Sequence, residues 1–201
     1  MKVLNLYAGI GGNRKLWEGV EVTAVELNPK IATIYQDFFP QDKMVIGDAH
    51  EYLLNHFSEF DFIWSSPPCP SHSRVRFANQ KQNKPIYPEM TLWQEVLFLK
   101  HYYKGKYCVE NVISFYKPLI APQELSQHYY WTNFMIAPMK KEYRGMGKNE
   151  NIKDLYKLKG FDLSKYSGID KMKTIRNCVE PKYGKHILDC AIGKQRQKQL
   201  L

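Results

Sequence analysis

The sequence predicts an α/β protein, with a doubly wound, mostly parallel sheet covered by helices on both faces. Three observations support this prediction. Over about the first 115 residues, short apolar runs alternate with helix-like amphipathic segments. A glycine-rich turn, Gly9-Ile10-Gly11-Gly12, follows the first apolar run. Polar residues follow the later runs, at the strand ends where open α/β sheets bind their ligands.

The elements are predicted in chain order as follows. The expected strands are Lys2–Leu6, Glu21–Val25, Met44–Ile46, Asp61–Trp64 and Lys106–Val109. Between them, apolar residues at helical spacing predict helices over Asn13–Glu18, Lys30–Phe39, Ala49–Phe57 and about Glu89–Tyr103. Beyond residue 120 the pattern is weaker, with a strand over Tyr129–Ile136, a basic loop over Met139–Asn151, and helices over Ile152–Lys159 and Lys182–Gln199.

Length and composition indicate one globular domain over residues 1–201, because 44% hydrophobic residues suffice for a single core. The 29 Lys and Arg against 20 Asp and Glu give a net charge of +9, which suits nucleic acid or, equally, a solvated basic surface. The four cysteines form no CxxC pair, so we expect neither a metal site nor disulfides. The N-terminus resembles no signal peptide, and no apolar stretch reaches the roughly 18 residues of a membrane span. We therefore expect a cytoplasmic protein without a membrane partner.

The glycine turn and two acids predict a cofactor site. Missing side chains at Gly9, Gly11 and Gly12 let a ligand approach the backbone, although a tight strand-to-helix turn explains the glycines equally well. The full GxGxxG spacing is absent, which disfavours NAD. Glu26 ends the second strand, where an acid can bind ribose hydroxyls, and Asp48 follows the third, where it can bind an adenine amino group. Each acid alone is more simply a solvated carboxylate, but together they favour an adenosine-containing ligand.

A cysteine and an acid at neighbouring strand ends predict the chemistry. Methylation of cytosine at carbon 5 needs a thiolate that adds to carbon 6 and an acid at ring N3. Cys69, after the fourth strand, and Glu110, after the fifth, meet these needs. We expect nearby cations to favour the Cys69 thiolate, whereas Cys108 and Cys190 fit the alternative of buried apolar thiols. The flipped base also needs basic and aromatic surroundings. His72, Arg74, Arg76, Phe77 and Lys81 can supply them.

Motifs spread in order over nearly the whole chain resemble those of the DNA (cytosine-5)-methyltransferase family. They are Leu6-Tyr7-Ala8-Gly9-Ile10-Gly11-Gly12, Glu26, Gly47-Asp48-Ala49, Pro68-Cys69, Glu110-Asn111-Val112, Leu158-Lys159-Gly160-Phe161 and Arg176-Asn177-Cys178-Val179-Glu180-Pro181. The resemblance implies a Rossmann-like methyltransferase fold with S-adenosylmethionine as cofactor, DNA as partner, and Cys69 and Glu110 as catalytic residues. The cofactor residues it implies are Tyr7, Gly9, Gly11, Gly12, Glu26, Leu27, Asp48, Ala49, Pro67 and Asn177.

The resemblance also places the DNA contacts. We expect Ser73, Arg74, Arg76, Asn111, Lys140, Lys141 and Arg144 to bind DNA, although the basic residues of the 139–151 loop fit a solvated loop as well. Target recognition would fall on a very small insert, residues 131–155, and would cover two to four bases. Residues 175–201 would return to the catalytic core. The sequence leaves open a restriction endonuclease partner and a homodimer.

Two departures from the family's pattern stand out. Pro70 follows the catalytic Cys where the family usually has Gln, and the Gln-x-Arg-x-Arg motif is missing near residues 126–131. Four other interpretations are weighed against DNA cytosine methylation. Ser66-Pro67-Pro68 resembles an amino-methyltransferase motif, but Cys69 replaces its aromatic residue. RNA methylation uses the same chemistry. The Pro-Cys-x-x-Cys signature of a zinc deaminase fails at His72. The fourth interpretation is a protein that binds DNA without catalysis.

Overall fold

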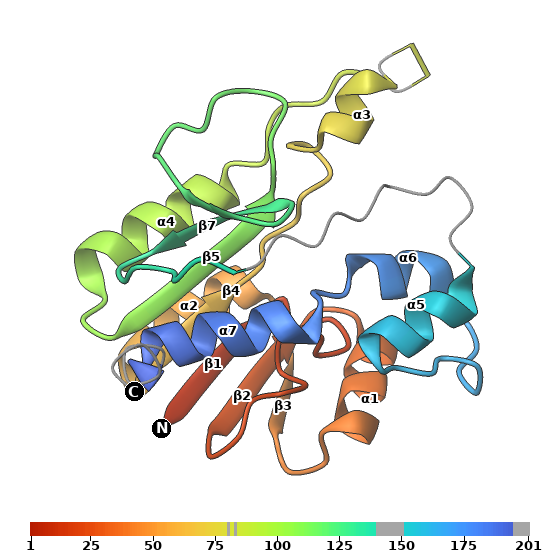
Figure 1. The fold of residues 1–201 in the computed structure, drawn as a ribbon, viewed down its shortest axis with the longest axis horizontal. Coiled ribbons are helices and arrows are strands. Elements are labelled where there is room, and N and C mark those ends of the chain that lie inside the picture. The colour runs from red at the N-terminus through yellow and green to blue at the C-terminus, as the bar shows by residue number, and fades with distance from the viewer. Residues whose placement is uncertain (80, 83, 140–150, 195–201) are drawn as a thin grey trace.

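The fold is a doubly wound sheet, as predicted. The structure is a computed structural model that describes residues 1–79, 81–82, 84–139 and 151–194. Within these residues, one sheet has the strand order β3-β2-β1-β4-β5-β7-β6 (Figure 1). The strands are β1 (Lys2–Leu6), β2 (Glu21–Glu26), β3 (Lys43–Ile46), β4 (Phe62–Ser65), β5 (Lys106–Val112), β6 (Gln123–Leu125) and β7 (His128–Thr132). The first five are parallel, and β7 joins β5 antiparallel.

Helices cover both faces of the sheet because neighbouring strand residues point to opposite sides. Leu4, Ile63 and Val109 pack on one face with α2 (Ala49–His56) and α4 (Thr91–Tyr102). Val3 and Trp64 pack on the other with α7 (Pro181–Ala191), and α1 (Pro29–Phe38) covers the same face through β2. The strand order reverses between β1 and β4, which puts the ligand-binding switch point at their carboxyl ends.

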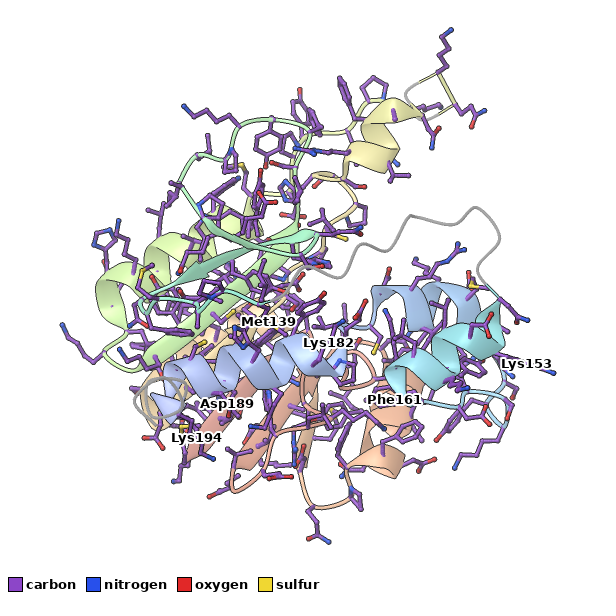
Figure 2. The ribbon with its side chains drawn as sticks, viewed as in Figure 1. Met139, Lys153, Phe161, Lys182, Asp189 and Lys194 are labelled. Carbon is purple, nitrogen blue, oxygen red and sulfur yellow. The ribbon has the colours of Figure 1, made fainter. Side chains whose placement is uncertain are left out.

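A second apolar cluster lies beside α1, away from the sheet. Here α5 (Ile152–Lys159) and α6 (Lys171–Asn177) pack on α1 around the fully buried Phe161. Figure 2 places Phe161 where this helix pair meets α1. The short helix α3 (Arg74–Ala78) stands apart from the helices that cover the sheet (Figure 1). Among the described residues, no helix is long and apolar enough to cross a membrane.

Several predicted boundaries are wrong. Asn13–Glu18 forms successive turns with i to i+3 hydrogen bonds rather than a helix, because Trp17 and Asn13 are held by tertiary contacts. β5 continues through Val112, so Glu110 lies within the strand, supported by pairing with β7. The strand predicted at 129–136 is His128–Thr132, and α7 ends at Ala191. α3, α6 and β6 were not predicted.

Candidate active site

The predicted site residues come from adjacent parallel strands and gather at one edge of the sheet. The glycine turn follows β1, Glu26 ends β2, Asp48 follows β3, and Cys69 follows β4. Glu110 lies near the carboxyl end of β5. Because β1, β2, β3, β4 and β5 are hydrogen-bonded neighbours in parallel register, their carboxyl ends form a single rim.

Glu26 ties the glycine turn to β2. One carboxylate oxygen accepts a hydrogen bond from Gly9 N at 3.0 Å, and the other accepts from Asn28 N at 2.9 Å. A Cβ added to Gly9, whose φ is +54°, would meet no atom within 4 Å, so the turn borders open space. Leu27, next to Glu26, is 68% exposed. An acid, an open backbone turn and an exposed apolar side chain fit the ribose, the methionine part and the adenine of S-adenosylmethionine.

Two glycines of the turn are required by close packing. A Cβ on Gly11, whose φ is +83°, would lie 2.3 Å from the ring of Phe39. A Cβ on Gly12 would lie 2.2 Å from the carbonyl oxygen of Val179. The segment after α6 therefore runs directly against the glycine turn, and Asn177, the exposed last residue of α6, lies two positions before that contact.

The buried carboxylate of Glu95, on α4, joins three segments of the cofactor site. It accepts a 2.6 Å hydrogen bond from the Tyr7 hydroxyl and another from the Ser65 hydroxyl, and His50 Nδ1 lies 3.1 Å away. Burial, and then the charge of Glu95, raise the pKa of Tyr7. The hydrogen bond to Glu95 raises the pKa of His50. Sequence analysis missed Glu95; an acid among the apolar residues Leu92, Val96 and Leu99 was the available signal.

The other residues predicted to bind the cofactor have contacts that belong to the fold. Asp48 is exposed and caps α2 by accepting from Glu51 N at 3.0 Å, so part of its role is structural. Ala49 and Pro67 are buried. Ala49 contributes to the core beneath the rim, and the Pro67 carbonyl anchors the catalytic loop.

A hydrogen bond holds the Cys69 loop against β5. The Asn111 side chain, which is only 1% exposed, donates to the Pro67 carbonyl at 2.9 Å. The Asn111 side chain thus contacts the loop rather than solvent, and its expected contact with DNA stays a prediction. Burial and then the Glu110 carboxylate raise the pKa of the half-buried Cys69 thiol.

The expectation that neighbouring cations favour the Cys69 thiolate is wrong. Arg74 Nε donates to the Ser114 carbonyl at 3.0 Å, and an Arg76 nitrogen donates to the Lys84 carbonyl at 2.8 Å. Burial lowers the pKa of His72, which favours the neutral ring. Burial and the charge of Glu110 therefore favour the protonated Cys69 thiol.

Glu110 has a polar neighbour that sequence analysis missed. His128 Nε2, from β7, lies 3.4 Å from Glu110 Oε1. The Glu110 side chain is 8% exposed and that of His128 is 34% exposed. The available signal for this residue was its place in the segment Gln127-His128-Tyr129-Tyr130-Trp131, where the expected arginines are absent.

The expected DNA-binding residues fall into two groups. Ser73, Arg74 and Arg76 lie on or beside α3, next to Cys69 in the chain, and Ser73 forms a β-bridge with Ser114. Exposed Phe77 on the same helix stacks on exposed Phe115, with ring centroids 4.6 Å apart. Lys140, Lys141 and Arg144 lie outside the described residues.

Among comparisons with known proteins, a match to a family model covers the same part of the chain. The family model described as C-5 cytosine-specific DNA methylase matches residues 1–118, which include Cys69 and Glu110. No curated protein matches the chain. A conserved hypothetical protein from Streptococcus pyogenes is 14% identical, with a TM-score of 0.41 over 65% of this chain and 83% of that chain. The Entamoeba histolytica methyltransferase EhMeth is 16% identical, with a TM-score of 0.45 over 77% of this chain and 59% of that chain. A DNMT2 mutant from Spodoptera frugiperda is 22% identical, with a TM-score of 0.39 over 55% of this chain and 35% of that chain. These likenesses add no weight to the family match.

The fold and the matched motifs define an S-adenosylmethionine-dependent methyltransferase with a Rossmann-like fold. The chain belongs to the C-5 cytosine-specific DNA methylase family, whose model covers more than half of its length. In the part of the chain that the structure describes, no group of three His, Cys, Asp or Glu residues is arranged to hold a metal ion.

Proposed function

We propose that this protein methylates carbon 5 of cytosine in DNA through a covalent adduct with Cys69. One observation carries the proposal: Asn111 holds the Cys69 loop against the strand that bears Glu110. A potential nucleophile and an acid thereby face one site, beside the turn that fits the cofactor. The match of the family model, which spans both residues, supports the same chemistry.

In this mechanism the Cys69 thiol gives its proton to solvent, and its sulfur forms a bond to carbon 6 of the flipped cytosine. The electron pair of the carbon 5–carbon 6 double bond moves into the ring. Glu110, protonated in this contact, donates a hydrogen bond to N3 and stabilises the added charge. S-adenosylmethionine, when bound, would supply the electrophilic methyl group that carbon 5 takes up, and would leave as neutral S-adenosylhomocysteine. Loss of the carbon 5 proton to solvent re-forms the double bond, and the Cys69 sulfur leaves as thiolate.

The raised pKa of Cys69 has a role in this scheme. A protonated thiol is a poor nucleophile, so the free enzyme is held in an unreactive form. When the base binds, Glu110 takes up a proton from solvent and donates a hydrogen bond to N3, which neutralises the carboxylate and removes one of the two causes of the raised pKa of Cys69. The thiol would then ionise only when its target is in place.

The test is incubation with tritiated S-adenosylmethionine and unmethylated plasmid, followed by nucleoside analysis. Label should appear in 5-methylcytosine and vanish in Cys69→Ala. Cys190→Ala is the matched control, because Cys190 is also a half-buried free thiol but lies on α7, and it should retain activity. Label only in an exocyclic amino group, or label in RNA but not DNA, would overturn the proposal. Binding of DNA without any methyl transfer would mean a catalytically impaired protein.

We also propose that target recognition is short. β7 ends at Thr132 and α5 begins at Ile152, so both ends of the expected 131–155 recognition segment belong to regular elements. Few residues remain between them for base contacts, and recognition of two to four bases follows. Bisulfite sequencing of treated plasmid checks this, since strict methylation of a six-base site would contradict it.

A further inference from the structure

The proposed base pocket lacks the arginines that the family's missing motif would provide, and β7 shows what stands beside Glu110 instead. In the antiparallel register, Glu110 pairs with Tyr130 and Val112 pairs with His128. Residues two apart on a strand share a face, so His128 lies on the same face of the sheet as Glu110. The distance of 3.4 Å between His128 Nε2 and Glu110 Oε1 agrees with this placement.

The geometry of this pair suits a binding site better than a structural ion pair. A distance of 3.4 Å is longer than a well-formed hydrogen bond, and a partly exposed pair of this kind contributes little to stability. Glu110 is nearly buried, whereas about a third of the His128 side chain remains exposed. The imidazole is therefore held next to the acid without being enclosed, and an edge of its ring is open to a ligand.

We propose that His128 is a substrate-binding residue, whose ring N–H donates a hydrogen bond to the carbon 2 carbonyl oxygen of the target cytosine. This inference rests on the proposed function. Along the Watson–Crick edge of cytosine, O2 and N3 accept hydrogen bonds and the 4-amino group donates. With Glu110 at N3 and the amino group, a donor beside Glu110 reaches the remaining acceptor. Addition of the Cys69 sulfur at carbon 6 spreads negative charge onto N3 and O2, so the donor at O2 stabilises the adduct more than the free base.

The neighbours of His128 on β7 cannot supply this donor in its place. Tyr129 and Trp131 pack on the opposite face of the sheet with α4, and the Trp131 ring nitrogen donates to the Ile120 carbonyl. Tyr130 is fully buried against Trp64. The His128 side chain places a ring nitrogen 3.4 Å from the Glu110 carboxylate.

The experiment measures methylation of plasmid by the full-length protein, with kcat and KM determined separately for plasmid and for S-adenosylmethionine. His128→Ala should lower kcat about 100-fold or more, as loss of one transition-state donor does. Affinity for S-adenosylhomocysteine, measured by calorimetry, should be unchanged. His128→Arg should retain at least tenfold more activity than His128→Ala, and added imidazole should partly restore His128→Gly. The matched control is His56→Ala, which breaks an exposed pair, with His56 Nδ1 2.6 Å from Glu59, at the far end of α2; its activity should not change.

The outcomes separate this inference from the proposed function. If the wild-type protein makes 5-methylcytosine and His128→Ala stays within about threefold of it, the inference fails while the proposed function stands. If His128→Ala and His128→Gly lose activity, but neither arginine nor imidazole restores it, the role of His128 is structural and the inference also fails. If the wild-type protein makes no 5-methylcytosine at all, the proposed function itself has failed.

Discussion

The cofactor side and the base side of the site are built differently. On the cofactor side, both oxygens of Glu26 are hydrogen-bonded, and the buried Glu95 binds Tyr7, Ser65 and His50. On the base side, the described residues between Arg74 and Met90, which are 74–79, 81–82 and 84–90, are mostly exposed. Arg74 donates to the Ser114 carbonyl, and Glu89 N donates to the Ser71 hydroxyl. The cofactor side of the proposed site is therefore the more rigid of the two, because buried hydrogen bonds hold its side chains. Exposed segments move more readily on binding, so we expect α3 to shift when DNA binds.

The largest effect is expected from a substitution that stops the chemistry on the base side and leaves the cofactor side unchanged. Glu110→Gln should lower methyl transfer about 1,000-fold, because the neutral amide cannot donate a proton to N3. The same change removes one cause of the raised pKa of Cys69, so iodoacetamide should alkylate Cys69 a few-fold faster at pH 7.5. Mass spectrometry of the Cys69 peptide measures this rate, and Glu124→Gln, in exposed β6, is the control. Slower alkylation in Glu110→Gln would contradict the arrangement.

The next effect tests whether the cofactor side depends on Glu95. Glu95→Ala should destabilise the protein by about 3 kcal/mol, because it leaves the buried Tyr7 and Ser65 hydroxyls without their acceptor. We expect affinity for S-adenosylhomocysteine to fall about tenfold or more in protein that remains folded. Glu95→Gln keeps an acceptor oxygen and should lose less on both measures. Chemical denaturation measures the loss of stability, and calorimetry measures the loss of affinity. Equal losses in Glu95→Ala and Glu95→Gln would mean that the charge of Glu95, rather than its hydrogen bonds, matters.

A third substitution tests the role of Glu26. Glu26→Ala removes two expected hydrogen bonds to the ribose and the bond to Gly9, so affinity for S-adenosylhomocysteine should fall about 100-fold. Glu21→Ala is the matched control, since Glu21 is exposed at the opposite end of the same strand. Calorimetric titration measures both. An unchanged affinity in Glu26→Ala would remove the basis for placing the ribose at this strand end.

The smallest effect concerns stability on the base side. Phe77→Ala removes half of the exposed stack with Phe115 and should cost about 1 kcal/mol or less. If the unfolding free energy falls as much as in Glu95→Ala, the contrast between the two regions is wrong. Chemical denaturation of both variants under one set of conditions decides this.

Local patterns in the sequence predicted most of the fold. The five parallel strands and the helices after β2, β3 and β4 follow from apolar periodicity, which is a property of short segments. The segment Asn13–Glu18 has the same periodicity, yet it forms turns because Asn13 bonds to Asn5 and Trp17 to Gly184. Contacts between residues so far apart in the chain leave no trace in a local pattern.

The candidate site was predictable where motifs carry it and not where packing does. Cys69, Glu110 and the glycine turn stand in recognisable motifs. Glu95 looks like one polar residue in an amphipathic helix, and only the fold shows that its carboxylate is buried among Tyr7, Ser65 and His50. The thiolate expectation for Cys69 failed for the same reason, because sequence proximity to Arg74 did not reveal that its guanidinium binds the Ser114 carbonyl.

The contact between the glycine turn and residues 179–184 bears on the order in which the protein folds. Gly12 packs against Val179, and the Trp17 ring nitrogen donates to the Gly184 carbonyl across 167 positions. During synthesis, the glycine turn is therefore fixed only after residues 179–184 have been made. We expect nascent chains to gain protection from protease by S-adenosylhomocysteine only once residue 184 has left the ribosome. Protection of shorter stalled chains would show that the turn forms without this partner.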